Sequence, residues 1–561
     1  MADVKDVPFP IWGDSTGTGA TDIPALAGTT VLMPNWQSIP VAEKTYRCKA
    51  CTGSSEADSR QLRFGLAVPG ATALRQGLEA LSAQRPLLAL WALLRAERLA
   101  ACYGDEAAAA AARRAAAGVE MPVPPAARRN GSLLLRAPAA AGARVSPERA
   151  YEEASEPKTD AAWRFEGFLV GGEVPRVDCG TEAGFQKALG YVRRRLPVIF
   201  LNLNLMPSTN KWDMNYLRRH TNEWPGMNVL RSAGGENRYL YYVPEQSDRD
   251  MAAFASAPRH ASSDMRLSFE GFLDTAKQDP SGRYYLQAPL VLRQPTDAGL
   301  TETWSPGIDA ELRKDCEQRV NRERLEALQA AGGFGFWSRS QLFVGPSESL
   351  SPAHYDQYDN IYMQVEGEKH FLLFDPRAAE GLYAFPVSHP YDEYAMVDLQ
   401  NVDSKSFPRA RRALEKRGAV ATLRPGEALF IPTHWWHHVQ GTASRGAWSI
   451  SVNFWFAIHR VLMEGPHPFP QHLELELARH VELLLSDVGG SASVGALARD
   501  LQKDAENAEL SELDETFFAV RLFLLDRLSA LLGAGNVAKF LSEHFPAERF
   551  QRSVVSKALR A

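Results

Sequence analysis

The 561-residue chain has few cysteines, no long apolar run and no excess of basic residues. Its five cysteines are too few for a disulfide framework. Cys48 and Cys51 form one C-x-x-C pair, but no second Cys or His pair follows at zinc-finger spacing, which favours reduced thiols over structural zinc. The longest apolar run, residues 87–94 ("LLALWALL"), is too short to cross a bilayer. The sequence therefore predicts neither a disulfide-rich scaffold nor a membrane partner.

The charge balance carries no signature of a nucleic-acid or anionic-membrane partner. Lys and Arg total 62 against 67 Asp and Glu, a formal net charge of -5, although a local basic patch is compatible with this total. The amino-terminal "MADVKDVPFP" has neither the apolar core of a secretory signal nor the arginines of a transit peptide. We therefore expect a cytoplasmic and/or nuclear protein and no nucleic-acid partner.

Changes in composition along the chain predict five regions. We expect an irregular, poorly ordered segment at 1–70, a helical segment at 71–120, an Ala/Pro-rich linker at 121–173, a strand-rich domain at 174–457 and a helical region at 458–561. Within the strand-rich domain, short strands such as 238–243 alternate with Gly and Pro turns, and helices are expected at 181–195, 266–277 and 308–331. Many short strands separated by turns predict an antiparallel sandwich or barrel.

The carboxy-terminal region carries apolar stripes at helical spacing. Leu473, Leu477, Val481 and Leu484 form one stripe, and a second helix is expected to begin near Ser511. Such stripes usually pack in a core. The more specific alternative is that they form the contact face of a dimer.

A histidine and an aspartate two residues apart suggest part of a metal site. His354 and Asp356 lie in "SPAHYDQYDN" (351–360), which alone is a weak signal. Two histidines and one carboxylate on one face of a divalent iron leave three positions open, enough for a bidentate co-substrate and dioxygen. Zinc favours four-coordinate closure, so an open triad favours iron.

The third ligand is expected in a later strand that opens at Pro425-Gly426 and continues into "THWWHHV" (433–439). His437 and His438 point to opposite faces of an extended chain, so only one of them can face the metal, and His434 is a weaker candidate. Alternation alone leaves this choice open.

The last strand and one lysine indicate a polar interior. In "AWSISVNFWF" (447–456), Trp455 shares a face with three small polar side chains, which suits a barrel lumen, because a solvent-facing side would expose the indole. Lys369 follows the turn at 366–368, which returns it toward the site. A lysine inside a barrel needs an anion. The dicarboxylate 2-oxoglutarate would supply one, although a lone lysine in a hairpin is usually solvated.

The chain resembles the JmjC/cupin-type Fe(II)/2-oxoglutarate oxygenases, most closely the branch of the factor-inhibiting-HIF asparaginyl hydroxylase. The resemblance rests on eight sequence blocks that occur in the order and at the spacing found in that family. The blocks are "KWDMNYLRRH" (211–220), "RYLYYV" (238–243), "YYLQ" (284–287), "SPAHYDQYDN" (351–360), "GEKHFLLFDP" (367–376), "LYAFPVSHP" (382–390), "RPGEALFIPTHWWHHV" (424–439) and "SVNFWF" (451–456). The resemblance implies a mainly β fold with flanking helices, built on a double-stranded β-helix (jelly-roll/cupin) core.

The resemblance also implies a role for each matching residue. The implied Fe(II) ligands are His354, Asp356 and His437, with 2-oxoglutarate and O2 as co-substrates. The implied 2-oxoglutarate contacts are Lys369, Tyr285, Ser351, Asn360 and Asn453. The implied substrate contacts are Tyr241, Gln287, Glu393, Tyr394 and Trp455. The expected activity is hydroxylation of a protein side chain, with an asparagine-containing loop such as that of an ankyrin repeat as substrate, by a homodimer formed through the carboxy-terminal helices.

Two departures qualify this expectation. Glu393 and Tyr394 stand where that branch carries an Arg-Gln pair that holds the target asparagine, so asparagine as the target is left open. The stretch at 308–331 looks inserted. A JmjC lysine demethylase and an RNA-modifying oxygenase are alternatives of the same fold. A catalytically inactive cupin that binds peptides, or a zinc cupin isomerase, comes from another class, but the full triad and Lys369 favour an oxygenase.

Overall fold

The structure is a computed structural model that describes most of the chain from residue 163 onward. The described residues are 114, 163–165, 168–170, 172–221, 224–232, 237–240, 262–279, 283–296, 299–346, 348–387, 389–441, 448–457, 473–507, 521, 524–525, 528–529 and 531–558. The predicted segment 1–70 and nearly all of the predicted segments 71–120 and 121–173 lie outside them, as do Cys48, Cys51 and Tyr241.

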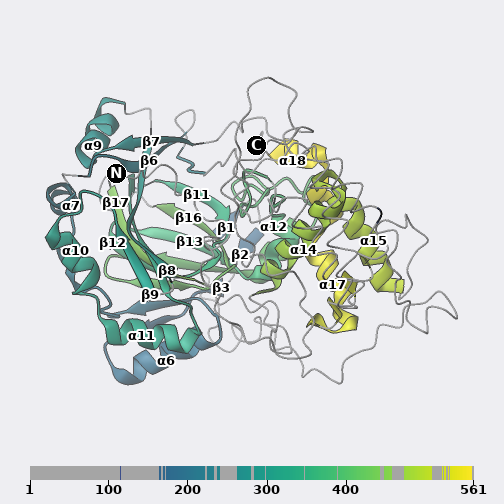
Figure 1. Ribbon diagram of the computed structural model, residues 1–561, viewed down its shortest axis with the longest axis horizontal. Coiled ribbons are helices and arrows are strands. Elements are labelled where there is room, and N and C mark those ends of the chain that lie inside the picture. The colour runs from purple at the N-terminus through teal and green to yellow at the C-terminus, as the bar shows by residue number, and fades with distance from the viewer. Residues whose placement is uncertain are drawn as a thin grey trace.

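The larger of two facing β-sheets has ten strands (Figure 1). Their order is β4-β5-β15-β12-β17-β10-β8-β6-β7, with β9 paired to β8. The strands are β4 (Arg176–Asp178), β5 (Val198–Leu201), β6 (Met227–Arg231), β7 (Ser263–Leu267), β8 (Tyr284–Thr296), β9 (Gly299–Trp304), β10 (Trp337–Pro346), β12 (Tyr358–Glu366), β15 (Ala428–Ile431) and β17 (Trp448–Ala457).

The smaller sheet has five strands in the order β11-β16-β13-β14-β3. They are β3 (Gly172–Glu173), β11 (Leu350–His354), β13 (Lys369–Phe374), β14 (Gly418–Leu423) and β16 (Trp436–Gly441), and a separate pair is formed by β1 (Trp163–Phe165) and β2 (Phe168–Val170). Strands β10, β12, β15 and β17 share one apolar core with the smaller sheet. These two layers are the halves of a double-stranded β-helix, which confirms the predicted fold class.

Helices flank the sheets on two sides (Figure 1). Along the outer side of the larger sheet lie α6 (Glu182–Arg193), α7 (Met214–His220), α9 (Phe269–Gln278), α10 (Ala310–Glu317) and α11 (Arg322–Gly332). On the other side gather α12 (Ala379–Leu382), α14 (Glu474–Gly489), α15 (Val494–Asn507), α17 (Ala534–His544) and α18 (Arg552–Ala558). The remaining described helices are α13 (Ala410–Arg417) and the short 3-10 helices η3 (Pro207–Lys211), η6 (Pro376–Ala378), η9 (Ser491–Ser493) and η10 (Ala547–Phe550).

Two predicted elements differ from the structure. The single helix expected at 308–331 is two helices, α10 and α11, because Asn321 takes an extended backbone and its side chain accepts the Arg324 N–H at 3.1 Å, which caps a new helix. The strand expected at 238–243 is wrong over its described part, since Arg238 makes only an isolated bridge with Leu350 and residues 241–243 are not described.

The turn between β12 and β13 returns the chain toward the interior, as predicted. Gly367 has a φ of +75°, and a Cβ there would lie 3.1 Å from the Trp448 carbonyl oxygen, so only glycine fits without strain. Lys369 then opens β13, paired with Leu423 on one side and Gly441 on the other. The turn therefore fixes where the lysine enters the fold.

The carboxy-terminal helices form a core of their own. Leu473, Leu477, Val481 and Leu484 are buried with residues of α15 and α17, so the predicted stripe is core within one chain. Leu524, Leu528 and Leu531 join this core, and the start of the second predicted helix, near Ser511, is not described. Dimer formation through these helices stays a prediction.

Among the described residues, no single helix has the length and apolar character to cross a membrane. One strongly bent pair, Glu474–Ser486 with Ser491–Glu506, passes the same test by length and composition alone.

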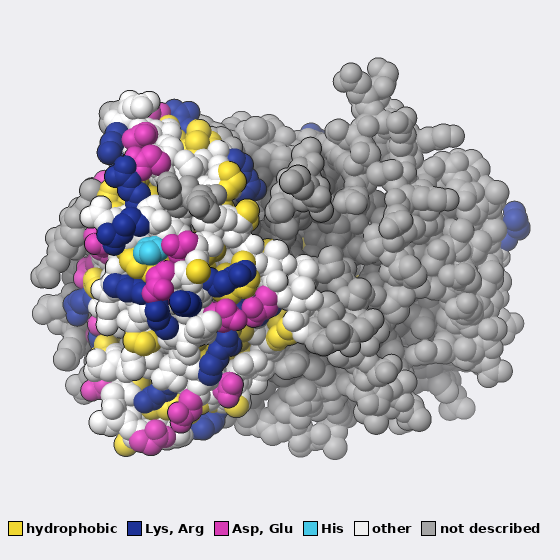
Figure 2. Space-filling view, turned by 60° about the vertical axis from the view of Figure 1, so that its left-hand side comes forward, with side chains coloured by type: hydrophobic (Ala, Val, Ile, Leu, Met, Phe, Trp, Pro, Cys, Tyr) yellow, Lys and Arg dark blue, Asp and Glu magenta, His cyan; other side chains and the backbone are white. Residues whose placement is uncertain are grey.

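The face covered by α7 and α10 carries both signs of charge (Figure 2). Basic and acidic side chains alternate over it, and several are paired, including Arg218 with Glu270 at 2.5 Å and Arg319 with Glu311 at 2.6 Å. Paired charges of this kind are an ordinary solvated surface.

Candidate metal centre

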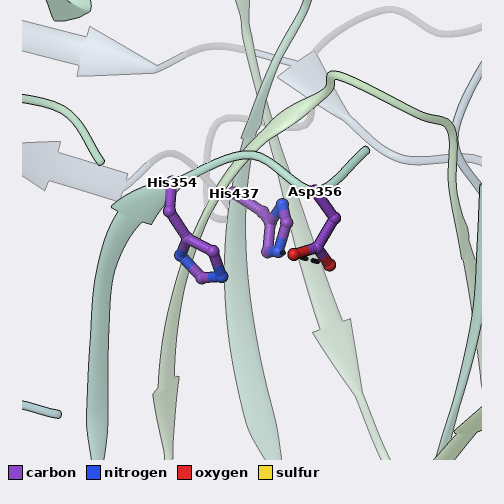
Figure 3. A group of neighbouring side chains, drawn as sticks. All are labelled: His354, Asp356 and His437. Carbon is purple, nitrogen blue, oxygen red and sulfur yellow. Dashed lines mark ion pairs between the residues drawn. The ribbon is translucent and has the colours of Figure 1, made fainter. Parts of the chain in front are cut away.

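His354, Asp356 and His437 converge from two segments that are distant in the sequence (Figure 3). His354 ends β11, Asp356 follows in the loop, and His437 lies on β16 directly opposite His354 in the strand register. One ligand atom from each of the three lies within 4.8 Å of the others. Antiparallel pairing of β11 with β16 thus brings together the three side chains predicted as metal ligands.

Hydrogen bonds select the tautomer of both histidines. The Nδ1 of His354 lies 2.7 Å from the Pro352 carbonyl oxygen, and the Nδ1 of His437 lies 2.9 Å from the Trp435 carbonyl oxygen. Because a carbonyl oxygen can only accept, each Nδ1 carries a proton, which leaves Nε2 as the nitrogen of each ring that can bind a metal. Burial, with the neighbouring His437, lowers the pKa of His354 to about 4, so its imidazole is neutral at pH 7.

The carboxylate is oriented by the predicted lumen-facing tryptophan. Trp455 Nε1 donates a hydrogen bond to Asp356 Oδ2 at 3.2 Å, and the same oxygen lies 3.7 Å from His437 Nε2. Trp455 is 4% exposed, so it faces the interior, as expected from the alternation in β17. A metal bound between these groups would replace the contact between His437 and Asp356.

The other two candidate histidines lie elsewhere. His438 points to the opposite side of β16, where burial lowers its pKa to about 3. The His434 side chain is turned toward the carboxy-terminal helices, with its Nε2 3.2 Å from Glu476 Oε2. In the described structure only His437 of the three joins the cluster with His354 and Asp356.

Lys369 is buried in the same interior, where the Phe343 ring lies near both its Nζ and Trp455, and it has no carboxylate partner among the described residues. Its side chain is 2% exposed, and its Nζ donates to the hydroxyls of Tyr285 at 3.0 Å and Tyr362 at 2.6 Å. The centroid of the Phe343 ring lies 5.8 Å from the Nζ. Burial lowers the pKa of Lys369 to about 7. A buried ammonium paired only with hydroxyls is a site for an anion.

Comparison with known proteins gives a match for this core. Residues 185–460, just under half of the chain, match the family model described as a cupin-like domain. The match agrees with the two facing sheets, so this segment has a cupin-like fold.

Similar proteins cover parts of the chain only. The human "HSPB1-associated protein 1" is 38% identical over 133 residues, which are 22% of this chain and 26% of that protein. "Lysine-specific demethylase JMJ31" from Arabidopsis thaliana is 28% identical over 170 residues, which are 30% of this chain and 28% of that protein. "Lysine-specific demethylase JMJ32" from the same plant is 31% identical over 141 residues, which are 20% of this chain and 40% of that protein. The chain thus matches about a quarter of the length of the HSPB1-associated proteins. Together these matches support the JmjC/cupin family, and closeness to the asparaginyl hydroxylase branch stays a prediction.

Two buried amides of the cupin-like domain have unused hydrogen-bonding atoms. Asn360 on β12 is 3% exposed, and its Oδ1 has no partner among the described residues. Asn453 on β17 accepts the Gln341 N–H at 3.1 Å, but its Nδ2 likewise finds no described partner. Buried amides normally satisfy both ends, so both side chains have an atom available to a polar ligand. Ser351, the fifth predicted contact, is half-buried on β11.

The predicted substrate contacts that the structure describes come from different elements. The Tyr394 ring centroid lies 5.3 Å from that of His354, and the two residues form an isolated bridge. Glu393 precedes it with a φ of +75°, and its Oε1 accepts from Gln357 Nε2. Burial raises the pKa of the Glu393 carboxyl. Gln287 is buried on β8, opposite Phe343 of β10.

Tyr362 and Phe343 are two interior residues that the sequence interpretation did not assign. Tyr362 makes the shorter of the two hydrogen bonds to Lys369. A signal was present, because Tyr362 shares a strand face with Asn360 and Gln364 on β12, and Gln364 bonds to Ser449 and Ser451 of the lumen face. Phe343 left no such signal, since an apolar residue in a strand is ordinary core.

The residues fit a divalent iron. Two imidazoles and one carboxylate supply three ligand atoms, which is the donor set of non-haem Fe(II) sites with open positions. His354, Asp356 and His437 would hold such an ion.

Proposed function

We propose that this protein is an Fe(II)/2-oxoglutarate-dependent dioxygenase that hydroxylates a side chain of a protein substrate. The observation that carries the proposal is that the same interior holds an open His-Asp-His triad and the buried Lys369, which lacks a carboxylate partner in the described structure. The JmjC/cupin relatives support the same class of chemistry. When bound, Fe(II) supplies activation of O2, coupled to the oxidative decarboxylation of 2-oxoglutarate to succinate and CO2.

The side chains around the metal divide the remaining tasks. Lys369 pairs with the distal carboxylate of 2-oxoglutarate, and the hydroxyls of Tyr285 and Tyr362 fix the orientation of the ammonium. Asn453 donates to the metal-proximal end of the keto acid through its unused Nδ2. Asn360 can donate there only with its amide group turned over, because its unused atom is the acceptor Oδ1. Trp455 keeps the Asp356 carboxylate turned toward the two imidazoles. These contacts hold the co-substrate and the metal ligands in fixed positions.

The neighbouring histidines of β16 provide a matched test. Protein reconstituted with Fe(II) under anaerobic conditions and then exposed to O2 and 2-oxoglutarate should form succinate, measured by mass spectrometry. His437→Ala and Asp356→Ala should lose at least about 100-fold of this activity, because each removes a metal ligand. His438→Asn, on the opposite face, should retain it at a temperature where circular dichroism shows it folded. Undiminished succinate formation by a variant with alanine at both His354 and Asp356 would falsify the proposal.

The target side chain needs a separate experiment. Incubation with a lysate and mapping of +16 Da sites, with His354→Ala as the control, should reveal the substrate. Asparagine in an ankyrin-type loop is the first expectation, but Glu393 and Tyr394 replace the Arg-Gln pair that holds asparagine in the branch that the chain resembles. A panel of peptides differing only in the central residue would show whether asparagine is preferred.

Lysine demethylation is a second candidate, favoured by the names of the Arabidopsis relatives. It uses the same metal and co-substrate, so the triad variants do not separate the two activities. Loss of 14 Da steps from N-methyl-lysine in a histone peptide panel would identify demethylation, whereas a gain of 16 Da with the methyl groups retained supports hydroxylation.

A further inference from the structure

A buried guanidinium on α14 joins two segments that flank the metal ligands. Arg479 is 2% exposed, and its Nη1 and Nη2 pair with both carboxylate oxygens of Asp392 at 2.6 and 2.7 Å. Its Nη1 also donates to the Tyr355 hydroxyl. One side chain thus contacts the loop at 392 and the residue that lies between His354 and Asp356 in the sequence. α14 follows the segment that matches the cupin-like domain.

The two segments held by Arg479 are also joined by their backbones. The Tyr355 N–H donates to the Glu393 carbonyl oxygen at 3.1 Å, and the Ala395 N–H donates to the Ala353 carbonyl oxygen at 2.8 Å. His354 lies between these two bonds. The position of the first metal ligand therefore depends on how the 392–395 segment is held, and Arg479 holds its start.

A second contact from the same helix reaches the second ligand. Glu476 Oε2 lies 3.2 Å from His434 Nε2, and the His434 N–H donates to the Asp356 carbonyl oxygen at 2.9 Å. His434 and Glu393 are non-glycine residues with φ values of +61° and +75°. Backbone strain of this kind persists only where surrounding contacts hold it. Here Glu476 of α14 contacts His434 itself, and Arg479 of α14 contacts Asp392, the residue before Glu393.

The contacts of α14 place its polar face inward. Glu476, Arg479 and Glu482 follow one another at intervals of one helical turn and are all buried. Glu482 accepts the Val387 N–H at 2.6 Å and pairs with Arg549 at 2.7 Å. The apolar stripe that begins at Leu473 packs on the other side, against α15 and α17. Figure 1 shows α14 between the sheets and these outer helices.

We propose that Arg479 is a positioning residue for the metal centre, acting through Tyr355 and Asp392. The inference rests on the proposed metal site. A buried, bidentate pair has one favourable geometry, because each charge is costly to leave unpaired. It therefore restricts the relative position of the segments that carry and support His354. Residues that orient metal ligands without touching the metal typically affect metal affinity by about 10- to 100-fold.

A second buried pair in the helical region provides the control. Asp504 of α15 pairs with Arg521, which follows later in the chain, and each is 1% exposed. The Arg521 Nε lies 2.7 Å from Asp504 Oδ2. This pair also joins a buried guanidinium to a buried carboxylate, but both residues belong to the helical region and neither lies in a segment that carries a metal ligand. Arg479→Lys and Arg521→Lys each keep the charge and lose the two-pronged geometry. A purely structural role for Arg479 predicts that both variants lose stability alike and that neither changes the metal site.

The experiment measures Mn²⁺ affinity by titration calorimetry and the Co²⁺ absorption spectrum, in full-length protein at a temperature where circular dichroism shows each variant folded. Arg479→Lys should bind Mn²⁺ about 10- to 100-fold more weakly, with altered Co²⁺ bands, whereas Arg521→Lys should match the wild type in both. Should Arg479→Lys fail to fold, Tyr355→Phe, which removes one hydroxyl, should weaken Mn²⁺ binding several-fold. Wild-type affinity and spectrum in whichever of these two variants folds would overturn the inference. Absence of metal binding by the wild type would instead refute the proposed function.

Discussion

At the scale of single residues, Lys369 carries the most specific consequence of the proposed chemistry. Its ammonium is buried against two hydroxyls, so it is poorly paired until an anion arrives. Lys369→Met should weaken 2-oxoglutarate binding by about 2–4 kcal/mol, because the distal carboxylate loses a charge-assisted partner. The same change should raise the free energy of unfolding of the ligand-free protein by about 1 kcal/mol or more, because an apolar side chain replaces a buried charge.

Calorimetry with 2-oxoglutarate and urea unfolding without it measure the two effects. The exposed Lys187→Met on α6 is the control and should change neither quantity. Equal 2-oxoglutarate affinity in Lys369→Met and wild type would mean that the carboxylate binds elsewhere.

The same lysine predicts a pH dependence. Burial lowers its pKa to about 7, while the unfolded chain keeps the ordinary value of 10.5. Between these values the unfolded chain binds more protons, so this residue makes the ligand-free protein more stable as the pH rises from about 7 to 10.5, and least stable below about 7. Among the described residues, the Tyr285 and Tyr362 hydroxyls and the uncharged Phe343 ring lie close to Nζ.

A bound dicarboxylate favours the protonated form, so binding at pH 8 should take up as much as about one proton per site. Calorimetry in two buffers of different ionisation enthalpy measures this uptake. Lys369→Met should show none, and equal uptake by the variant would assign the proton to another group.

At the scale of secondary-structure elements, the turn between β12 and β13 makes a second testable link between fold and site. Gly367 and Gly426 both have positive φ values, +75° and +84°. A Cβ added at Gly426 would meet no atom within 4 Å. A Cβ added at Gly367 would lie 3.1 Å from Ser449 Cα and from the Trp448 carbonyl oxygen. Gly426→Ala should therefore cost only the dihedral strain, roughly 1–2 kcal/mol of unfolding free energy. Gly367→Ala should cost more and should also weaken 2-oxoglutarate binding, because Lys369 follows two residues later. Urea midpoints measure the first effect and calorimetry the second. A cost for Gly367→Ala no greater than that for Gly426→Ala would show that the turn adjusts freely.

Several elements were predictable because their signals are local. β17 follows from apolar alternation and β13 from a short apolar run, each bounded by turn signals, and His354 with Asp356 follows from a short motif. The choice between His437 and His438 was not predictable from alternation, which says that they face opposite ways but not which way is inward. Which of the two histidines faces inward is set by the pairing of β16 with β11, a contact between segments that are distant in the sequence.

The inward polar face of α14 was also beyond local reasoning. In the sequence, Glu476, Arg479 and Glu482 look like the solvated side of an amphipathic helix, since charged residues are rarely buried. Their partners, such as Asp392, lie far away in the sequence. Only the docked helix shows that these charges meet a second set of charges on the cupin-like domain.

At the scale of the whole molecule, the contacts of α14 make the cupin-like domain and the carboxy-terminal helices depend on each other. A chain ending at Ala457 would lose Arg479 and Arg549, and would leave Asp392 and the loop around 385–387 without their buried partners. Removing one member of a buried ion pair costs about 3–5 kcal/mol, a large part of the stability of an ordinary domain. We therefore expect the shortened chain to lose its cooperative unfolding transition and its Mn²⁺ binding together. Thermal unfolding followed by circular dichroism, and calorimetry with Mn²⁺, measure both losses. Cooperative unfolding with wild-type Mn²⁺ affinity in the shortened chain would show instead that residues 458–561 are an appendage, with no part in shaping the metal centre.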